Sequence, residues 1–97
     1  MIQRTVLVKF SEATTEEQLQ EVVTRFKALK NHLKGIVELQ AGRNILERNK
    51  EFQIVLTVRF EDQEALDAYV ADPDHQALAR YIKEVGKIDS IGVDFKI

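Results

Sequence analysis

Cysteine and tryptophan are absent from this 97-residue sequence, and proline occurs once, at position 73. Without cysteine the chain has no disulfide, no thiolate nucleophile and no cysteine-ligated zinc or iron–sulfur site. Its four glycines are scattered at the ends of the expected elements, so the phosphate-loop and dinucleotide-binding signatures are missing. Ser11 and Ser90 lack the context of a catalytic triad. These absences exclude several common kinds of catalytic site.

The chain also lacks an excess of either charge, because it has 14 basic and 16 acidic residues and the two signs are interspersed. We therefore expect no nucleic-acid partner, which would need a concentrated cationic face. No apolar signal region and no run of about eighteen apolar residues is present, so we expect neither export nor membrane insertion and predict a cytoplasmic location. The length and the 44% hydrophobic content predict one globular domain, residues 1–97.

Apolar and polar residues alternate with the period of a β-strand in four segments. The inward face of residues 2–10 holds Ile2, Arg4, Val6, Val8 and Phe10. In residues 51–60 it holds Phe52, Ile54, Leu56, Val58 and Phe60. Residues 87–97 place Ile91, Val93, Phe95 and Ile97 on one face, and a shorter strand aligns Val37, Leu39 and Ala41 before a strand end or bulge at Gly42-Arg43-Asn44.

Helical periodicity separates these strands. The first helix is expected to begin at a capping box, Thr14 with Glu17 or Thr15 with Gln18, and to run for about twenty residues before Gly35. Its apolar stripe is Leu19, Val22, Val23, Phe26, Leu29 and Leu33, and His32 lies near its end in a solvated position. A short helix capped by Asp62 and a second one starting at Pro73 precede the last strand.

The order strand, helix, strand, strand, helix, strand predicts an α+β, ferredoxin-like βαββαβ fold, a four-stranded antiparallel sheet with the helices on one face. Nothing in the chain is left to cover the other face. Leu7 and Val55, with Ile36 as a further candidate, make that face semi-apolar. We therefore predict a homodimer with two-fold symmetry that buries it.

The segment Asp72-Pro73-Asp74-His75 has two interpretations. In one, Asp72 caps a helix by accepting the backbone N–H of His75, and the imidazole is incidental. In the other, the positive helix end lowers the pKa of His75 and keeps it a neutral base near pH 7. In one unbroken helix Tyr69 and His75 would face different ways, whereas the break at Pro73 could bring them to one cavity. Tyr69 is otherwise a core aromatic residue.

Arg4 points toward the helices with its apolar neighbours. An unpaired buried guanidinium is costly, so Arg4 must reach water, a carboxylate or an anionic ligand. His32 and His75 do not have the spacing of metal ligands, and we predict no metal site.

Several of these segments together resemble the stress-responsive A/B barrel domain family, the Dabb proteins. The carriers are VLVKF at 6–10, Gly42-Arg43-Asn44, FEDQEALDAY at 60–69 and DPDH at 72–75, where the family usually has HPxH. The resemblance spans nearly the whole chain and implies a dimeric α+β barrel. It also implies an apolar pocket between sheet and helices, with the expected lining Arg4, Val6, Val8, Phe26, Leu56, Tyr69 and His75.

We expect this pocket to bind a small hydrophobic or carbonyl-bearing molecule, and whether the protein also transforms that molecule is left open. Three rival functions are considered beside binding. A plant polyketide cyclase of the family closes a linear poly-β-keto thioester by an aldol reaction, without metal or organic cofactor, and its catalytic tyrosine and histidine fall on Tyr69 and His75. A further pocket histidine of that enzyme falls on Arg4. Other members imply a noncatalytic structural oligomer in the stress response. A cofactor-free or haem-degrading monooxygenase shares the barrel, but the absence of tryptophan and the lack of a second well-placed histidine disfavour it.

Overall fold

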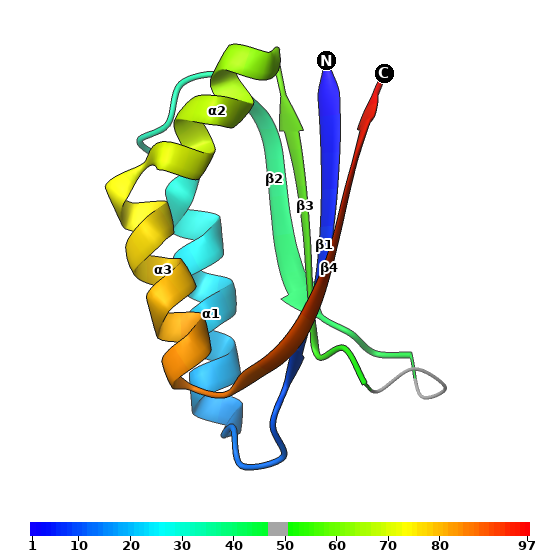
Figure 1. The fold of residues 1–97 in the computed structure, drawn as a ribbon, viewed down its shortest axis with the longest axis vertical. Coiled ribbons are helices and arrows are strands. Elements are labelled where there is room, and N and C mark those ends of the chain that lie inside the picture. The colour runs from blue at the N-terminus through cyan, green and yellow to red at the C-terminus, as the bar shows by residue number, and fades with distance from the viewer. Residues whose placement is uncertain (47–50) are drawn as a thin grey trace.

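In the computed structural model, which describes residues 1–46 and 51–97, strands and helices follow the predicted order (Figure 1). The elements are β1 (Ile2–Phe10), α1 (Glu16–Leu29), β2 (Ile36–Arg43), β3 (Ile54–Phe60), α2 (Gln63–Ala71), α3 (Pro73–Glu84) and β4 (Lys87–Lys96). The four strands form one antiparallel sheet in the order β2-β3-β1-β4. The predicted ferredoxin-like α+β fold is confirmed.

All three helices cover the same face of the sheet, and no described element covers the other (Figure 1). Between the layers lies a core of aliphatic and aromatic side chains drawn from every helix and from β1, β2 and β3. Phe60 and Tyr69 are its largest fully buried members, and their rings pack edge to face with centroids 5.2 Å apart. Burial of this apolar surface is the main term that stabilises the fold.

The helix starts follow the predicted capping chemistry. Thr15 and Gln18 form the capping box of α1, with the Thr15 side chain accepting from the Gln18 backbone N–H at 3.1 Å. Asp62 caps α2 by accepting the Ala65 N–H. Asp72 caps α3 and accepts the backbone N–H groups of Asp74 and His75, both at 3.0 Å, while Pro73 is the first helical residue.

The first helix is shorter than predicted. It spans 14 residues and ends at Leu29, so His32 lies in the turn before β2 and not in the helix. The backbone of this turn is tied to the segment between β3 and α2, because the Glu61 N–H donates to the Gly35 carbonyl at 2.9 Å. Leu33 still packs against the core from the turn. Tertiary packing, not helix propensity, therefore sets the end of α1.

Two strand assignments need correction. Val37 is an extra residue in β2, because Ile36 pairs with Phe60 and Glu38 with Arg59. This bulge exposes Val37 and turns Ile36 to the core, so Ile36 does not belong to the open face. Strand β3 begins at Ile54, which leaves Phe52 outside it.

The register places the apolar residues of β4 on the open face. Three residues of β4, Ile91, Val93 and Phe95, pair with Leu7, Thr5 and Gln3 of β1, respectively. The same three residues of β1 pair on their other side with Val55, Thr57 and Arg59 of β3. Directly opposed residues share a face. Val93 and Phe95 are 56% and 57% exposed, so the apolar surface anticipated from Leu7 and Val55 extends over β4.

No helix among the described residues is long and apolar enough to cross a membrane.

Candidate functional site

Tyr69 and His75 are brought together at the α2–α3 junction. Tyr69 is in the last turns of α2 and His75 in the first turn of α3, and their ring centroids are 4.4 Å apart. The break at Asp72 and Pro73 changes the chain direction between them, as the sequence required for the two rings to converge. Among the described residues, the Tyr69 hydroxyl and His75 Nδ1 are both buried without a hydrogen-bond partner.

Both side chains are held in their neutral forms. Burial raises the pKa of the Tyr69 phenol to about 12, although the nearby Arg4 charge works against that shift. Burial also lowers the pKa of His75, and Arg4 lowers it further, while the Val70 carbonyl and the Asp72 charge oppose them. The predicted direction for His75 is right, but burial is its principal cause. Near pH 7 the pair offers a hydroxyl donor and an uncharged imidazole.

Of the partners expected for Arg4, which were water, a carboxylate or an anionic ligand, the structure shows a carboxylate. Its Nε and Nη2 donate to the two oxygens of Asp94 at 2.8 and 3.0 Å, across the β1–β4 pair. This bidentate hydrogen bonding raises the pKa of Arg4 and lowers that of Asp94. The two side chains remain 21% and 40% exposed, so they form a charged, partly solvated border beside the Tyr69–His75 pair.

The apolar residues expected to line a pocket lie in the core or against it. Val8, Phe26 and Leu56 are buried members of the core, and Val6 is partly buried against it. A surface hollow of about 190 Å³ lies nearby, with the lining Ile2, Gln63, Leu66, Asp94, Phe95 and Lys96. Asp94 therefore connects this hollow to Arg4, whereas Tyr69 and His75 are outside its lining.

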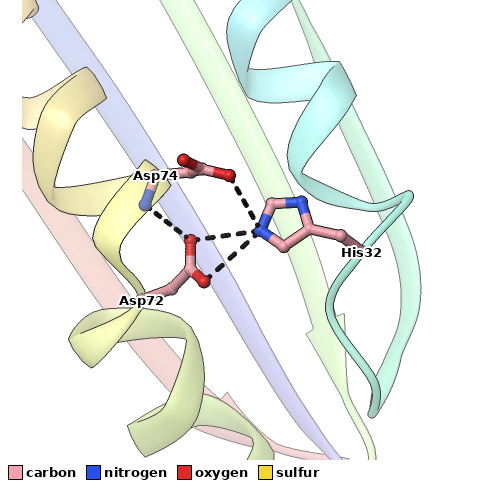
Figure 2. Close-up of side chains that lie close together, drawn as sticks. All are labelled: His32, Asp72 and Asp74. Atoms are coloured by element: carbon pink, nitrogen blue, oxygen red, sulfur yellow. Dashed lines mark hydrogen bonds and ion pairs between the residues drawn. The ribbon is translucent and has the colours of Figure 1, made fainter.

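A second polar cluster is on the other side of the α2–α3 junction (Figure 2). His32 Nε2 lies 3.3 and 3.2 Å from Oδ1 and Oδ2 of Asp72, and 3.3 Å from Oδ2 of Asp74. The three residues each offer a donor atom within 4.8 Å of the others, a grouping that could hold a metal ion. Partial burial raises the pKa of Asp72, but hydrogen bonds from the His75 backbone and from His32 outweigh it and lower the pKa overall.

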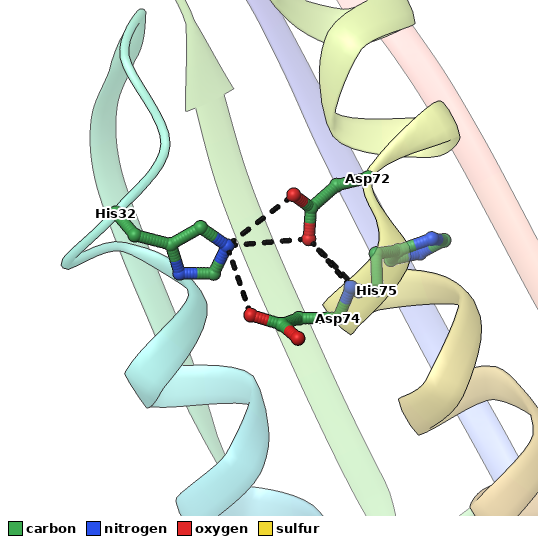
Figure 3. Close-up of polar contacts among 4 residues, drawn as sticks. All are labelled: His32, Asp72, Asp74 and His75. Carbon is green, nitrogen blue, oxygen red and sulfur yellow. Dashed lines mark hydrogen bonds and ion pairs between the residues drawn. The ribbon is translucent and has the colours of Figure 1, made fainter.

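The two histidines point in opposite directions from this junction. Figure 3 shows the His75 ring directed away from the cluster, while the His32 ring points into it between the two aspartates. Asp72 belongs to both sides, because its Oδ2 accepts the backbone N–H of His75 and faces His32 Nε2.

Two partners in these sites were missed from the sequence. Asp94 could have been found, because it alternates with Val93 and Phe95 and so shares a face with inward-pointing Arg4 once β4 pairs with β1. The cluster of His32 with Asp72 and Asp74 had no local signal, since 40 residues separate His32 from Asp72. Only the packing of the turn after α1 against the α2–α3 junction brings them together.

Comparison with known proteins gives the chain relatives at several levels. The model of the family described as Stress responsive A/B Barrel Domain, Dabb, matches residues 2–97. Olivetolic acid cyclase of Cannabis sativa is 25% identical over 76 residues, which are 76% of this chain and 75% of the cyclase.

Two solved structures share the fold at low sequence identity. A dimeric ferredoxin-like protein of unknown function from Thermobifida fusca superposes with a TM-score of 0.88 at 19% identity, covering 99% of this chain and 90% of that one. A dimeric protein of unknown function with a ferredoxin-like fold from Bacteroides fragilis gives 0.83 at 22% identity, covering 99% and 95%.

Proposed function

This chain belongs to the stress responsive A/B barrel domain family, and we propose that it acts as a homodimer that binds a small hydrophobic, carbonyl-bearing molecule beside Tyr69 and His75. The observation that carries the proposal is the pair of neighbouring buried polar atoms, the Tyr69 hydroxyl and His75 Nδ1, without partners among the described residues.

Self-association is supported by the open face of the sheet. Its apolar residues on β4, Ile91, Val93 and Phe95, continue through Leu7 of β1 to Val55 of β3. A contiguous apolar surface of this kind is costly to leave in water. The solved relatives from Thermobifida fusca and Bacteroides fragilis are described as dimeric, and a second copy packed on this face would bury it.

Ligand binding is supported by the energetics of the Tyr69–His75 pair. A buried polar atom that lacks a partner costs about 1–3 kcal/mol. A carbonyl oxygen can accept from the neutral tyrosine hydroxyl, and a polarised group beside it can satisfy the imidazole nitrogen. The apolar residues around the pair suit a ligand whose remaining body is hydrophobic.

A catalytic form of this function is supported by the similarity to olivetolic acid cyclase. Here His75 would act as the general base and take a proton from a carbon between two carbonyl groups, while Tyr69 donates a hydrogen bond to the developing enolate. The enolate carbon then bonds to a second carbonyl carbon in an aldol step, and the proton returns from His75 to the new alkoxide. No metal or organic cofactor takes part.

The binding test uses heptane-2,4-dione, a β-diketone with an apolar tail, titrated into ¹⁵N-labelled protein and followed by chemical shifts. Tyr69→Phe and His75→Ala should each weaken binding by about tenfold, the value of one lost hydrogen bond. Tyr81→Phe is the matched control, because Tyr81 stacks under Arg25 away from the pair. Equal affinity in all three variants would contradict the proposal.

The catalytic test supplies a linear poly-β-keto thioester and detects cyclised product by mass spectrometry. His75→Ala should abolish turnover and leave the melting temperature nearly unchanged, because His75 is half-buried and its Nδ1 has no hydrogen-bond partner in the described part of the chain. The noncatalytic structural oligomer would be favoured by a different result. In that case His75→Ala would lower the melting temperature, and neither the wild-type protein nor the variant would bind or turn over a carbonyl compound.

A further inference from the structure

We propose that His32, Asp72 and Asp74 form a binding site for one divalent transition cation of the zinc class. The site is on the outer side of the α2–α3 junction, whereas the His75 ring is on the other side (Figure 3). The inference is therefore independent of the proposed function.

The donor atoms already have the separations of a coordination shell. His32 Nε2 is 3.3 Å from Oδ1 of Asp72 and 3.3 Å from Oδ2 of Asp74. Zinc binds imidazole nitrogen and carboxylate oxygen at about 2.0–2.2 Å, so two ligands of a tetrahedral site are roughly 3.4 Å apart. A cation can occupy the space between the three side chains with small adjustments of their rotamers.

The charges of the cluster also call for a cation. The two carboxylates lie within 4.8 Å of His32 Nε2 and of each other, and neither makes an ion pair with a lysine or arginine among the described residues. Two facing carboxylates repel each other. A doubly positive ion matches both negative charges and takes the lone pair of Nε2.

The donor types select among metals. One imidazole nitrogen with two carboxylate oxygens suits zinc and its transition-metal neighbours, while magnesium and calcium favour oxygen ligands alone. Three protein ligands leave a fourth position open, and a hollow of about 200 Å³ bordered by His32 and Asp74 gives water access to it.

Metal binding at this position would join two separate parts of the fold. His32 belongs to the turn between α1 and β2, and the aspartates begin α3 (Figure 2). Asp72 would keep its capping role, because the Oδ2 lone pairs that accept the backbone N–H groups of Asp74 and His75 leave Oδ1 free for the metal.

Isothermal titration of tag-free, chelator-treated protein with Zn²⁺ tests the site. We expect one ion per chain. His32→Gln and Asp74→Asn should each weaken binding by at least about tenfold, since even the loss of an outer partner of a metal ligand costs 10–100-fold. Both side chains are exposed, so the variants should fold, which circular dichroism checks. Asp72 is left intact because it caps α3.

His75→Gln is the matched control, because it removes the only other histidine and should leave Zn²⁺ affinity unchanged. In NMR spectra, Zn²⁺ should shift the ring signals of His32 and spare those of His75. The proposal is overturned if binding is not stoichiometric, if it survives His32→Gln, or if it is lost in His75→Gln. The absence of Zn²⁺ binding to the wild-type protein would also overturn it.

Discussion

Strands β3 and β4 flank the same central strand, β1, but their surroundings differ at every position. On β3 the helix-facing residues Ile54, Leu56, Val58 and Phe60 are all fully buried under the helices. On β4 every residue is exposed, on the helix side as well as on the open side. The apolar residues of β3 build the core, and those of β4 are left available to a partner.

The difference between the two strands explains why the Arg4–Asp94 ion pair lies at β4. The helix-facing side of β4 holds Ser90, Gly92 and Asp94, which alternate with its outward apolar residues. Small and polar side chains there leave the Arg4–Asp94 pair in contact with water. One strand therefore contributes the apolar surface proposed for association on one side and a charged border beside the Tyr69–His75 pair on the other.

The largest effect should come from β3. Phe60→Ala removes a fully buried ring that packs against Tyr69, and we expect the free energy of unfolding to fall by about 3–5 kcal/mol in urea denaturation. The matched change on β4, Phe95→Ala, should cost less than about 0.5 kcal/mol at concentrations where the protein is monomeric. Similar losses in the two variants would remove the distinction between the strands.

The proposed association through the open face of β4 is tested by Val93→Lys. A lysine on the open face would bury a charge in the proposed dimer, and we expect its dissociation constant to rise at least about thirtyfold, a loss of roughly 2 kcal/mol. Light scattering would then report a monomer of 11.2 kDa. Ser90→Lys places the same charge on the helix-facing side of β4 and should stay dimeric.

A smaller and opposite effect is expected at Gly92. Its added Cβ would lie 3.8 Å from Val6 Cγ2, an ordinary contact, so Gly92→Ala should stabilise β4 by about 0.5–1 kcal/mol in thermal denaturation. Gly35→Ala is the contrasting variant. It should destabilise the fold, because Gly35 has a φ of +85° and its Cβ would come within 2.5 Å of the Ala65 Cβ.

The smallest effect concerns acid stability. Hydrogen bonding to Arg4 lowers the folded-state pKa of Asp94, so the pair stabilises the fold above the unfolded pKa of about 3.9 and loses that contribution as the pH falls through the folded value. For a partly exposed pair we expect about 0.2–1 kcal/mol. Asp94→Asn should remove this acid dependence, whereas Asp89→Asn should keep it.

Local patterns predicted much of this architecture. Alternation located β1 and β4 and most of β3, and the helix starts followed from Thr15, Asp62, Asp72 and Pro73 because capping is a short-range interaction. The errors fall where distant contacts compete with local preference. The end of α1 at Leu29 and the bulge at Val37 both depend on how the turn before β2 meets α2 and β3.

The sequence by itself determined the order of elements, the helix caps and the inward position of Arg4, because each depends on residues a few positions apart. Only the tertiary structure decided that Arg4 meets Asp94, that Tyr69 contacts His75 and that His32 faces two aspartates. These contacts join side chains brought together by strand pairing, by the break at Pro73 and by helix packing. Their geometry is set by the whole fold, so no local pattern encodes it.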